Sequence, residues 1–467
     1  MKPNKAFDLI NYIIIETSIS RMVNIVIIGL GSAGFAAFLA IRRTDPDAFI
    51  TIIEKRSYQM FSPCGMPYAI EGIINLSKLS FSLPEDKQST KLLMHEATSI
   101  DLIAKNVRAK NLGTGEFLSI PYDFLIIAQG ATPFIPPIKG ARENLDNGVY
   151  VLHDIESART ISDHAGKAKK VVVVGAGPIG LEIAVALRTR GLGVVVVEML
   201  SYAMPRALDR DMAKLVERPL EASGIKFIFN KSVKSINGSP VNSISTGEEI
   251  IETDMVILAS GVRANFEISK NAGIEHGNWG IKTNAGMETN IKGIYAVGDC
   301  IETVSLINNR PTIMQLSSPA YRQGMVAGTN AAGGYDTYEG VLGTFVTVLG
   351  NLEIAATGFN EFAAESAGYK IVSGKAHGKS KPEYYPGARD ITVKIIADAR
   401  TGKVLGGQAV GEGAGAIINV ISLGIRCNID VFSMARTEMA YCPMVGENYN
   451  VLNKAADFAT RKLEKGK

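Results

Sequence analysis

The stretch Asn24-Ile25-Val26-Ile27-Ile28-Gly29-Leu30-Gly31-Ser32-Ala33-Gly34 decides the fold of the first part of the chain. Its first five residues predict a buried parallel strand, and its three glycines predict a tight turn whose backbone can approach a pyrophosphate. A helix from Phe35 to Arg43 follows, so the phosphate would meet the helix N-terminus. A second strand, Phe49 to Ile53, ends at Glu54, whose carboxylate can accept hydrogen bonds from ribose hydroxyls. Together these features predict a dinucleotide-binding unit.

The same pattern repeats in the middle of the chain. Lys170 to Val174 predicts a strand, Gly175-Ala176-Gly177-Pro178-Ile179-Gly180 a second glycine loop, and Leu181 to Arg190 a helix. A further strand, Val194 to Val197, ends at the acid Glu198. Two dinucleotide units in one chain are a much rarer coincidence than one, so the repeat favours a redox protein.

The other expected elements fall into two groups. Apolar runs that end in glycine predict further buried strands at 122–130, 254–261 and 294–299, and a helix is expected at 317–331. After about residue 338 the pattern changes to shorter alternating strands, typical of a separate α+β domain. Its expected elements are strands at 344–349, 391–396 and 404–410, a hairpin turn at 398–403, and helices at 412–426 and 447–463.

Composition is that of an ordinary globular chain: 467 residues, 46% hydrophobic and 20% charged. A formal net charge of +3 without a dense basic cluster argues against a nucleic-acid or membrane partner. The four cysteines are widely spaced and contain no CxxC, which fits a reducing cytoplasm and predicts neither disulfides nor a metal site. Residues 1–21 contain an apolar run, 13–15, that is too short for a signal or a membrane span, so we expect an N-terminal extension.

A lone cysteine follows the first unit directly, in Phe61-Ser62-Pro63-Cys64-Gly65-Met66-Pro67-Tyr68. It opens a short helical run, Cys64 to Ile70, and the positive end of a helix dipole favours the reactive thiolate. Most free cysteines simply pack as small hydrophobes, and the stretch alone fits that role as well. The two dinucleotide units around it favour a redox thiol.

Three features together resemble the FAD-dependent pyridine nucleotide-disulfide oxidoreductases: the two GxGxxG loops and the strand Tyr295-Ala296-Val297-Gly298-Asp299. The resemblance covers about residues 22–460. It implies an α/β fold with two Rossmann-like domains, for FAD and for NAD, and a C-terminal α+β domain that forms a homodimer. The implied boundaries are 22–138 with 261–335 for FAD, 139–260 for NAD(P)H, and 336–467 for dimerisation.

The resemblance also assigns cofactor residues. Those implied for FAD are Gly29, Gly31, Ser32, Ala33, Gly34, Glu54, Lys55, Gly130 and Asp299, the last of which touches the ribityl chain of the flavin in this family. Those implied for NAD are Gly175, Gly177, Gly180, Glu182 and Glu198, with Glu182 near the nicotinamide–flavin contact. Glu198 would repel the 2′-phosphate of NADPH and so favours NADH, while Arg206 nearby keeps NADPH possible.

The single cysteine resembles the branch that holds coenzyme A-disulfide reductases, NADH oxidases and NADH peroxidases, in which the thiol cycles as a mixed disulfide or a sulfenic acid. Oxidases and peroxidases carry a histidine where this chain has Ser32, which favours a coenzyme A-disulfide reductase. Two motifs of those reductases match Tyr384-Tyr385-Pro386-Gly387 and Ala440-Tyr441-Cys442-Pro443. They imply that Tyr384 and Tyr441 protonate the thiolate that leaves at the partner subunit's Cys64, although either tyrosine could be an amphipathic core residue.

Three further residues fall at substrate positions of such reductases. Arg43 and Lys87 match cations that bind the coenzyme A phosphates, and Tyr321 matches a substrate-site position. As single charges, Arg43 and Lys87 are equally consistent with a solvated surface.

The chain departs from the branch pattern at Met60, Pro63 and Met444, which leaves the thiol substrate open, with polysulfide or elemental sulfur among the alternatives. The predicted function is NAD(P)H-dependent reduction of coenzyme A disulfide or a related low-molecular-weight disulfide or polysulfide through Cys64. The alternative is an NADH oxidase or peroxidase that uses a Cys64 sulfenic acid. An electron-transfer reductase for a small protein partner would need no redox cysteine.

Cys442 occupies the position of a histidine that CxxxxC members of the family contribute to the partner's active site, and Glu447 keeps the position of their glutamate. Two interpretations stay open. Cys442 either fills space beside Tyr441, or lies near the partner subunit's Cys64 as a second thiol.

Overall fold

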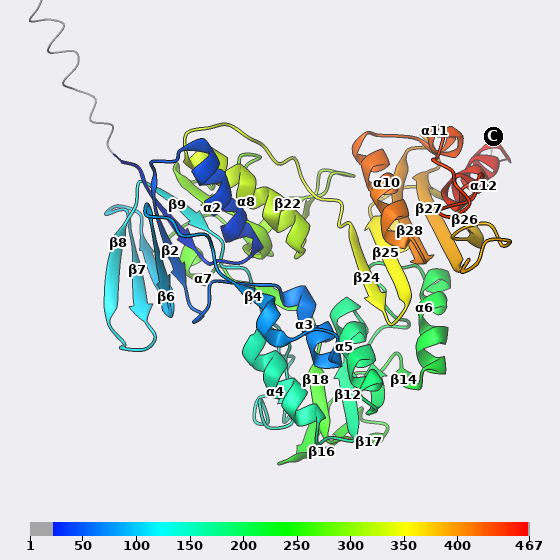
Figure 1. Cartoon of the computed structure of the whole chain (residues 1–467), viewed down its shortest axis with the longest axis horizontal. Helices are drawn as coiled ribbons and strands as arrows, with labels where there is room; N and C mark the ends of the chain where they lie inside the picture. The colour runs from blue at the N-terminus through cyan, green and yellow to red at the C-terminus, as the bar shows by residue number, and fades with distance from the viewer. Residues whose placement is uncertain (1–21, 466–467) are drawn as a thin grey trace, which may run out of the picture.

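The computed structural model describes residues 22–465, so the extension expected at 1–21 lies outside the described residues. The first unit, at the left of Figure 1, is built on an all-parallel five-stranded sheet in the order β21-β9-β1-β2-β5. Its strands are β21 (Ile294–Ala296), β9 (Phe124–Ile127), β1 (Asn24–Ile28), β2 (Phe49–Glu54) and β5 (Ser89–Leu93). The central strand β1 is apolar because both faces of the sheet are covered. The first glycine loop therefore leaves β1 at the carboxyl edge, between the ends of β2 and β9.

The second unit, at the lower centre of Figure 1, repeats this arrangement in the order β11-β18-β12-β13-β14. Its parallel strands are β11 (Val149–Tyr150), β18 (Met255–Leu258), β12 (Lys170–Val174), β13 (Gly193–Val197) and β14 (Ile225–Ile228). A three-stranded antiparallel sheet accompanies each unit. These sheets are β6 (His95–Asp101), β7 (Asn106–Asn111) and β8 (Phe117–Pro121), and β15 (Ser235–Gly238), β16 (Val241–Ser245) and β17 (Ile250–Glu252). The predicted fold with two Rossmann-like units is confirmed.

Helix α8 (Ser317–Ala331) returns the chain to the first unit and lies beside α2 (Ser32–Thr44) (Figure 1). Two glycines allow this close approach. A Cβ atom at Gly324 would lie 2.1 Å from the Ala33 carbonyl oxygen, and one at Gly328 would lie 2.3 Å from that of Ala37. Because only glycine fits there, the sequence places α8 directly behind the helix that follows the first glycine loop.

The C-terminal unit, at the right of Figure 1, has an antiparallel sheet in the order β24-β25-β28-β27-β26. Its elements are β24 (Phe345–Leu349), β25 (Leu352–Gly358), α9 (Glu361–Ser366), β26 (Ile371–Lys379), β27 (Asp390–Asp398), β28 (Val404–Gly411), α10 (Ala414–Arg426), α11 (Val431–Arg436) and α12 (Val451–Lys465). The sequence predicted three of the strands and two of the helices. It missed β25, β26, α9 and α11. The helices α9 and α11 have only six residues each, which is too short for a clear helical pattern. Strand β26 (IVSGKAHGK) contains two glycines, two lysines and a histidine, which weaken the strand pattern.

Shorter elements connect the sheets. They are β3 (Met60–Phe61), η1 (Pro63–Gly65), α3 (Met66–Glu71), η2 (Leu76–Leu79), β4 (Ser80–Phe81), β10 (Ala131–Pro133), α4 (Ile155–Ala165), α5 (Pro178–Thr189), α6 (Arg210–Ala222), β19 (Val262–Ala264), α7 (Glu267–Asn271), β20 (Ile281–Lys282), η3 (Gly298–Cys300), β22 (Ile301–Val304) and β23 (Pro311–Thr312). Within residues 22–465, no helix has the length and apolar character that crossing a bilayer requires.

A buried charge cluster joins the second unit to the C-terminal unit. The Lys394 ammonium lies 2.9 Å from a carboxylate oxygen of Asp209, 2.9 Å from Asp211 and 3.0 Å from Glu361, and only 5% of its side chain is exposed. Gln408 donates to Asp209 over 2.7 Å and accepts the backbone N–H of Asp209 over 2.8 Å. Burial alone would lower the pKa of Lys394, but these carboxylates outweigh it and raise the pKa, so the lysine stays charged.

Replacing Lys394 should weaken the contact between the second unit and the C-terminal unit. In Lys394→Met, the buried Asp209 carboxylate and the partly exposed Glu361 carboxylate lose their shared cation, which costs up to about 3–5 kcal/mol. We therefore expect a clearly lower midpoint of unfolding in urea than in the wild type. Lys375→Met is the matched control, since Lys375 binds Asp211 at the surface, where such pairs contribute about 1 kcal/mol or less. Equal midpoints for the two variants would contradict the stabilising role of Lys394.

Candidate active site

The first glycine loop combines tight packing with one open position. A Cβ atom at Gly29 would lie 2.3 Å from the Ala128 carbonyl oxygen, and one at Gly34 would lie 2.0 Å from the carbonyl oxygen of Gly29. At Gly31, by contrast, no atom lies within 4 Å of that position. The outer two glycines therefore hold the helix against the strand, and Gly31 leaves the space that a pyrophosphate would take.

Helix α2 begins at this loop without a side-chain cap. Its first helical backbone bond runs from Phe35 N–H to the Gly31 carbonyl, so the N–H groups of Ser32, Ala33 and Gly34 have no helical acceptor. Helix α5 begins in the same way at Gly177. Two uncapped, positively polarised helix ends at glycine loops suit two dinucleotide phosphates.

Glu54 closes the first loop from the end of β2. Its buried carboxylate accepts the Leu30 N–H over 2.8 Å and two hydrogen bonds from the Arg56 guanidinium, over 2.8 and 2.7 Å. Burial would raise the pKa of Glu54, but the hydrogen bonds and charge of Arg56 outweigh it and lower the pKa. The predicted ribose acid is thus ionised and fixed in place, while Lys55 beside it is exposed.

The second loop has the same geometry. A Cβ atom at Gly180 would lie 2.1 Å from the Gly175 carbonyl oxygen, and the position of a Cβ at Gly177 is open. Glu198 accepts the Ala176 N–H over 2.8 Å and the Leu200 N–H over 2.9 Å. Among the residues that the structure describes, no lysine or arginine pairs with Glu198, so its charge is less compensated than that of Glu54.

Asp299 lies close to the first glycine loop, at the start of α2. It follows β21 in η3, where a Cβ atom at Gly298 would lie 3.0 Å from the Cβ of Ala33 at the start of α2. Burial raises the pKa of Asp299 to about 6, and no donor among residues 22–465 hydrogen-bonds to it. Gly130, at the end of β9, has a φ of +65° and open space at its Cβ position. A partly buried carboxyl without a hydrogen-bond donor fits the hydroxyl-bearing chain of a flavin nucleotide, and Gly130 adds open space after β9.

Cys64 lies in the η1 turn, before α3 and not at its first residue. The predicted thiolate stabilisation by a helix dipole is wrong. Although the side chain is partly open to solvent, burial of the sulfur raises the pKa of Cys64, and the carboxylates of Glu182 and Asp299 raise it further. Burial first, and then these two carboxylates, disfavour the Cys64 thiolate in this structure.

Glu182 comes to Cys64 from the second unit. Helix α3 packs on α5 through a shared apolar cluster that includes Met66, Ile70 and Ile183. The Glu182 carboxyl accepts a hydrogen bond of 2.5 Å from the Thr347 hydroxyl on β24, and burial raises its pKa although this bond acts in the opposite direction. The site thus draws on all three units of the chain.

Tyr384 and Tyr441 come together, although they are far apart in the sequence. Tyr384 lies beside Tyr441, and the interaction between the two hydroxyls is the first cause of the raised pKa of Tyr441. Both side chains are exposed, as is Cys442. In Figure 1 the segment between α11 and α12 lies well away from α3, so the described chain does not bring these tyrosines to its own Cys64. Their role at Cys64 stays a prediction that requires a second subunit.

The predicted substrate residues lie along one surface. The Phe35 ring contacts that of Phe81 at 6.5 Å and that of Tyr321 at 6.4 Å between centroids, and Phe81 and Tyr321 are exposed. Arg42 binds Asp86 at 2.5 Å and so joins the end of α2 to the loop after β4. Their chain neighbours Arg43 and Lys87 are therefore close in space, and both are exposed. We call Phe35, Phe81, Tyr321, Arg43 and Lys87 the acceptor surface.

For Ser32, Arg56 and Thr347, the sequence predicted either no role at the site or a different role. The Ser32 hydroxyl hydrogen-bonds to the Ser317 hydroxyl at the start of α8, over 2.9 Å. This pair of serines therefore offers no acidic group that could give a proton to peroxide. Arg56 was missed, although its position two residues after Glu54, on the same side of the strand extension, was a usable signal. Thr347 had no signal, because it lies 165 residues from Glu182.

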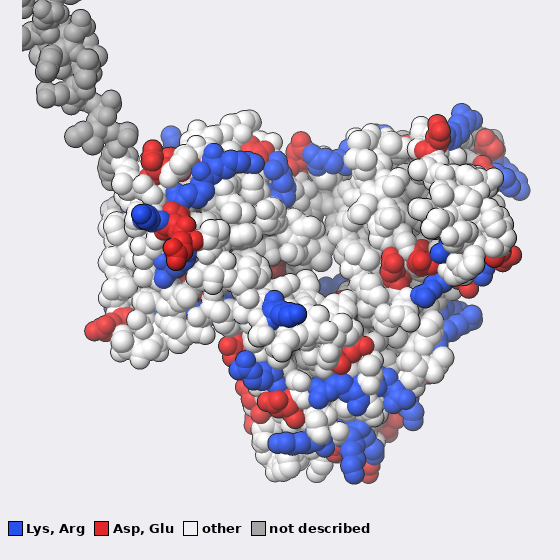
Figure 2. Space-filling view, viewed as in Figure 1, with Lys and Arg blue, Asp and Glu red and all other residues white. Residues whose placement is uncertain are grey.

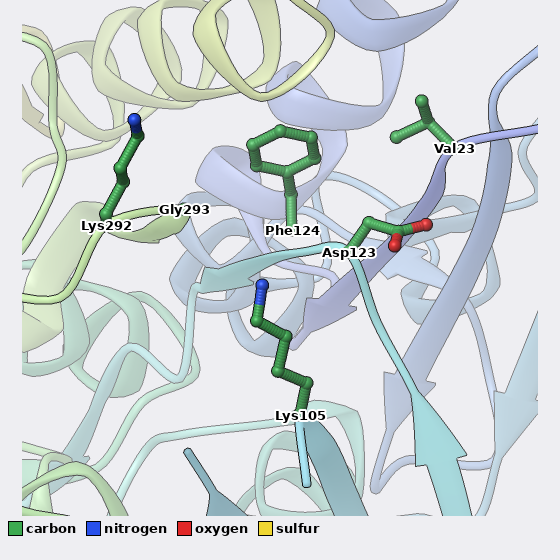
Figure 3. Close-up of a pocket in the computed structure, with 6 residues that line it drawn as sticks. All are labelled: Val23, Lys105, Asp123, Phe124, Lys292 and Gly293. Carbon is green, nitrogen blue, oxygen red and sulfur yellow. The ribbon is translucent and has the colours of Figure 1, made fainter. Parts of the chain in front are cut away.

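The hollow drawn in Figure 3 is separate from this site. It measures about 460 Å³ and is lined by Val23, Lys105, Asp123, Phe124, Lys292 and Gly293. Apart from Lys105, which lies between β6 and β7, these residues precede or begin β1, β9 and β21, so the hollow lies at the amino edge of the sheet, opposite the glycine loop. Over the described part of the chain, no group of three His, Cys, Asp or Glu side chains could hold a metal ion.

Comparison with known proteins agrees with this architecture. Residues 23–324 match the family of pyridine nucleotide-disulphide oxidoreductases, and residues 344–452 match the dimerisation domain of that family. The NADH oxidase of Methanocaldococcus jannaschii is 39% identical over 446 residues, which are 94% of this chain and 99% of that protein. The CoA-dependent NAD(P)H sulfur oxidoreductase of Pyrococcus furiosus is 33% identical over 426 residues, 90% of this chain and 95% of that protein.

Two solved structures are similar over nearly the whole described fold. Reduced Bacillus anthracis CoADR-RHD superposes with a TM-score of 0.91 at 29% identity and covers 95% of this chain and 81% of that chain. The NAD-dependent persulfide reductase from A. fulgidus superposes with a TM-score of 0.90 at 32% identity and covers 95% and 84%. The fold and the site therefore define a flavin-dependent enzyme that oxidises a pyridine nucleotide. The chain belongs to the pyridine nucleotide-disulphide oxidoreductase family, as predicted.

The geometry of Glu198 predicts a preference for NADH. Its carboxylate would face the 2′-position of the ribose without a cation, so kcat/KM should be higher for NADH than for NADPH by about tenfold or more. Glu198→Gln, which removes the charge, should narrow this ratio, whereas Glu248→Gln, an exposed carboxylate of the same unit, should not. A wild-type kcat/KM higher for NADPH would contradict the assignment.

Proposed function

We propose that the protein reduces a low-molecular-weight disulfide or polysulfide of the coenzyme A type with NADH, through the single thiol of Cys64. In this proposal it acts in the cytoplasm as a homodimer, with the domain boundaries expected from the sequence. The acceptor surface is the observation that carries the proposal.

The acceptor surface connects the thiol to positive charge. Phe81 pairs with Met60 in the β3–β4 ladder, four residues before Cys64. Phe35 on α2 contacts the rings of Phe81 and Tyr321, and the last turn of the same helix carries Arg43. Figure 2 shows basic side chains gathered over the region of α2 and α8. An apolar wall that ends in two cations suits a thiol carried on a long arm with phosphates, as in coenzyme A.

The proposed cofactors fit the residues that the structure brings together. The N-terminus of α2, Glu54 and Asp299 would hold FAD, and the N-terminus of α5 with Glu198 would hold NADH. Bound FAD supplies the two-electron chemistry between nicotinamide and thiol. The chain positions the reacting groups and sets the ionisation of Cys64.

The thiol step balances as a disulfide exchange. The Cys64 thiolate attacks one sulfur of RS–SR, a new S–S bond joins Cys64 to one half, and the other half leaves as a thiolate. The Tyr384–Tyr441 pair of the partner subunit would give that thiolate a proton, and the raised pKa of Tyr441 keeps the proton available at neutral pH. Two electrons from NADH then release the second half, so NADH, one proton and RS–SR yield NAD⁺ and two RSH.

The alternative function is an NADH oxidase, and the 39% identical relative from M. jannaschii with that name supports it. In that case peroxide or oxygen would convert Cys64 to a sulfenic acid. The Ser32–Ser317 pair disfavours this alternative, because neither hydroxyl is acidic enough to protonate a leaving peroxide oxygen efficiently. The intact mass of the isolated protein separates the two: coenzyme A bound to Cys64 supports the reductase, and added oxygen atoms support the oxidase.

Replacing the thiol tests the reductase directly. Cys64→Ser should keep bound FAD and its reduction by NADH, and should lose turnover with coenzyme A disulfide by at least about a thousandfold, because the exchange step needs the sulfur. Cys427→Ser, at another exposed cysteine, is the matched control. Unchanged turnover in Cys64→Ser would remove this thiol from the mechanism.

The two cations test the substrate class. Arg43→Gln combined with Lys87→Gln should raise KM for coenzyme A disulfide by roughly tenfold, since each exposed contact to a phosphate contributes about 1 kcal/mol or less. KM for NADH and for a small uncharged disulfide should not change. Lys105→Gln, an exposed lysine at the opposite edge of the sheet, serves as the control. An equal effect on the uncharged disulfide would argue against phosphate recognition.

A further inference from the structure

The segment 199–209 follows the acid Glu198 and lies against the second glycine loop. Its Met204 N–H donates to the Ala176 carbonyl over 2.9 Å, and the Ala176 N–H donates to the Glu198 carboxylate over 2.8 Å. The two peptide groups that flank Ala176 are thus held by the acid and by the segment 199–209. The open position at Gly177, where a pyrophosphate would lie, comes directly after them.

Met204 depends on its surroundings for its backbone conformation. Its φ is +54°, in the left-handed region that residues with a side chain disfavour. Such a conformation persists only where neighbouring structure fixes it. Ala203, Met204 and Leu208 are buried, and the Ala203 N–H donates to the Glu217 carboxylate over 2.9 Å. Contacts from outside the segment therefore decide where the Met204 N–H points.

The C-terminal unit supplies several of these contacts. The amide of the buried Asn360 donates to the Pro205 carbonyl over 3.1 Å and, at a longer distance of 3.5 Å, to the Leu208 carbonyl. The N–H of Glu361 donates to the Asp209 carboxylate over 2.9 Å. Helix α6, which begins after Asp209, lies beside β28 of the same unit (Figure 1). Asn360 thus anchors the chain directly after Met204.

Asn360 has two roles that can be separated. Its side-chain oxygen accepts the Ala363 N–H over 2.8 Å and so caps α9, while its amide nitrogen binds the segment 199–209. A helix cap of this kind needs only an oxygen, which serine or threonine also provides. The amide donor therefore adds nothing to the cap, and its contacts lie in the second unit.

We propose that Asn360 is a positioning residue for the pyridine nucleotide: its amide holds the segment 199–209 where Met204 fixes the second glycine loop. The inference rests on the NADH site proposed at that loop and does not depend on Cys64. A loop that is anchored in its binding geometry does not have to be ordered by the nucleotide, which favours binding. The C-terminal unit thereby acts on cofactor binding within its own chain, in addition to the role predicted for it across a dimer.

The test is flavin reduction by NADH in the holoenzyme, without oxygen or disulfide, followed by stopped-flow absorbance. Asn360→Ser keeps an oxygen that caps α9, but its side chain is one bond too short to replace the amide donor. The NADH concentration that gives the half-maximal rate should rise about threefold to tenfold, because a hydrogen bond and the preorganisation of the loop are lost. The limiting rate should change by less than about twofold, since the effect is on binding and not on the reacting groups.

The matched control is Asn144→Ser. Asn144 is a buried asparagine of the second unit, and its amide donates to the Gly140 carbonyl over 3.0 Å. This variant should keep the wild-type half-maximal NADH concentration. Deuterium uptake of peptides from 199–209 gives a second readout, which should rise in Asn360→Ser and stay at the wild-type level in Asn144→Ser.

A wild-type half-maximal NADH concentration in Asn360→Ser, or a fall in the limiting rate alone, would overturn the proposal. If Asn360→Ser does not fold, Asn360→Thr decides it by the same criteria, because threonine also caps α9 without an amide. No disulfide takes part in this measurement, so its result is distinct from the loss of disulfide turnover expected in Cys64→Ser. A wild-type flavin that NADH does not reduce would contradict the proposed function and, with it, this inference.

Discussion

The close packing of helix on strand in the two glycine loops is the constraint on which the rest of the structure depends. In each loop the third glycine lies so near the carbonyl of the first that a Cβ atom would be 2.0 or 2.1 Å from the oxygen. Without a side chain there, the helix can start directly at the sheet edge and point its free N–H groups outward. The acids at the ends of β2 and β13 then bind the same loops from the side. Each unit is thereby shaped for a dinucleotide before any ligand binds.

The two nucleotide units share a geometry but differ in charge. Glu54 is paired with Arg56, whereas Glu198 is held only by backbone N–H groups. Arg56 also lies 4.8 Å from the centre of the Phe61 ring, at the start of the segment that carries Cys64. Arg56 thus connects the acid of the first loop to the segment that carries Cys64, whereas no lysine or arginine among the described residues pairs with the acid of the second loop.

The active site is an assembly of three units, and none of them could form it alone. Cys64 belongs to the first unit, Glu182 to the second and Thr347 to the C-terminal sheet. The buried Lys394 cluster fixes the start of α6, in the second unit, against that sheet. Packing of α3 on α5 fixes the first unit against the second. The surroundings of one thiol thus depend on contacts between all three units.

Local rules in the sequence determined the repeated elements: strands β1, β2, β12 and β13, the glycine loops, and the acids that follow them. These features depend on residues within about thirty positions of one another, where turn chemistry and apolar runs are direct guides. The pairing of Tyr384 with Tyr441, the bond from Thr347 to Glu182 and the raised pKa of Cys64 were decided only by the tertiary structure. A helix-start rule predicted a stabilised thiolate, but burial and two acids from distant segments outweigh it. An ionisation state depends on every charge and every apolar atom nearby in space, and sequence distance does not measure that nearness.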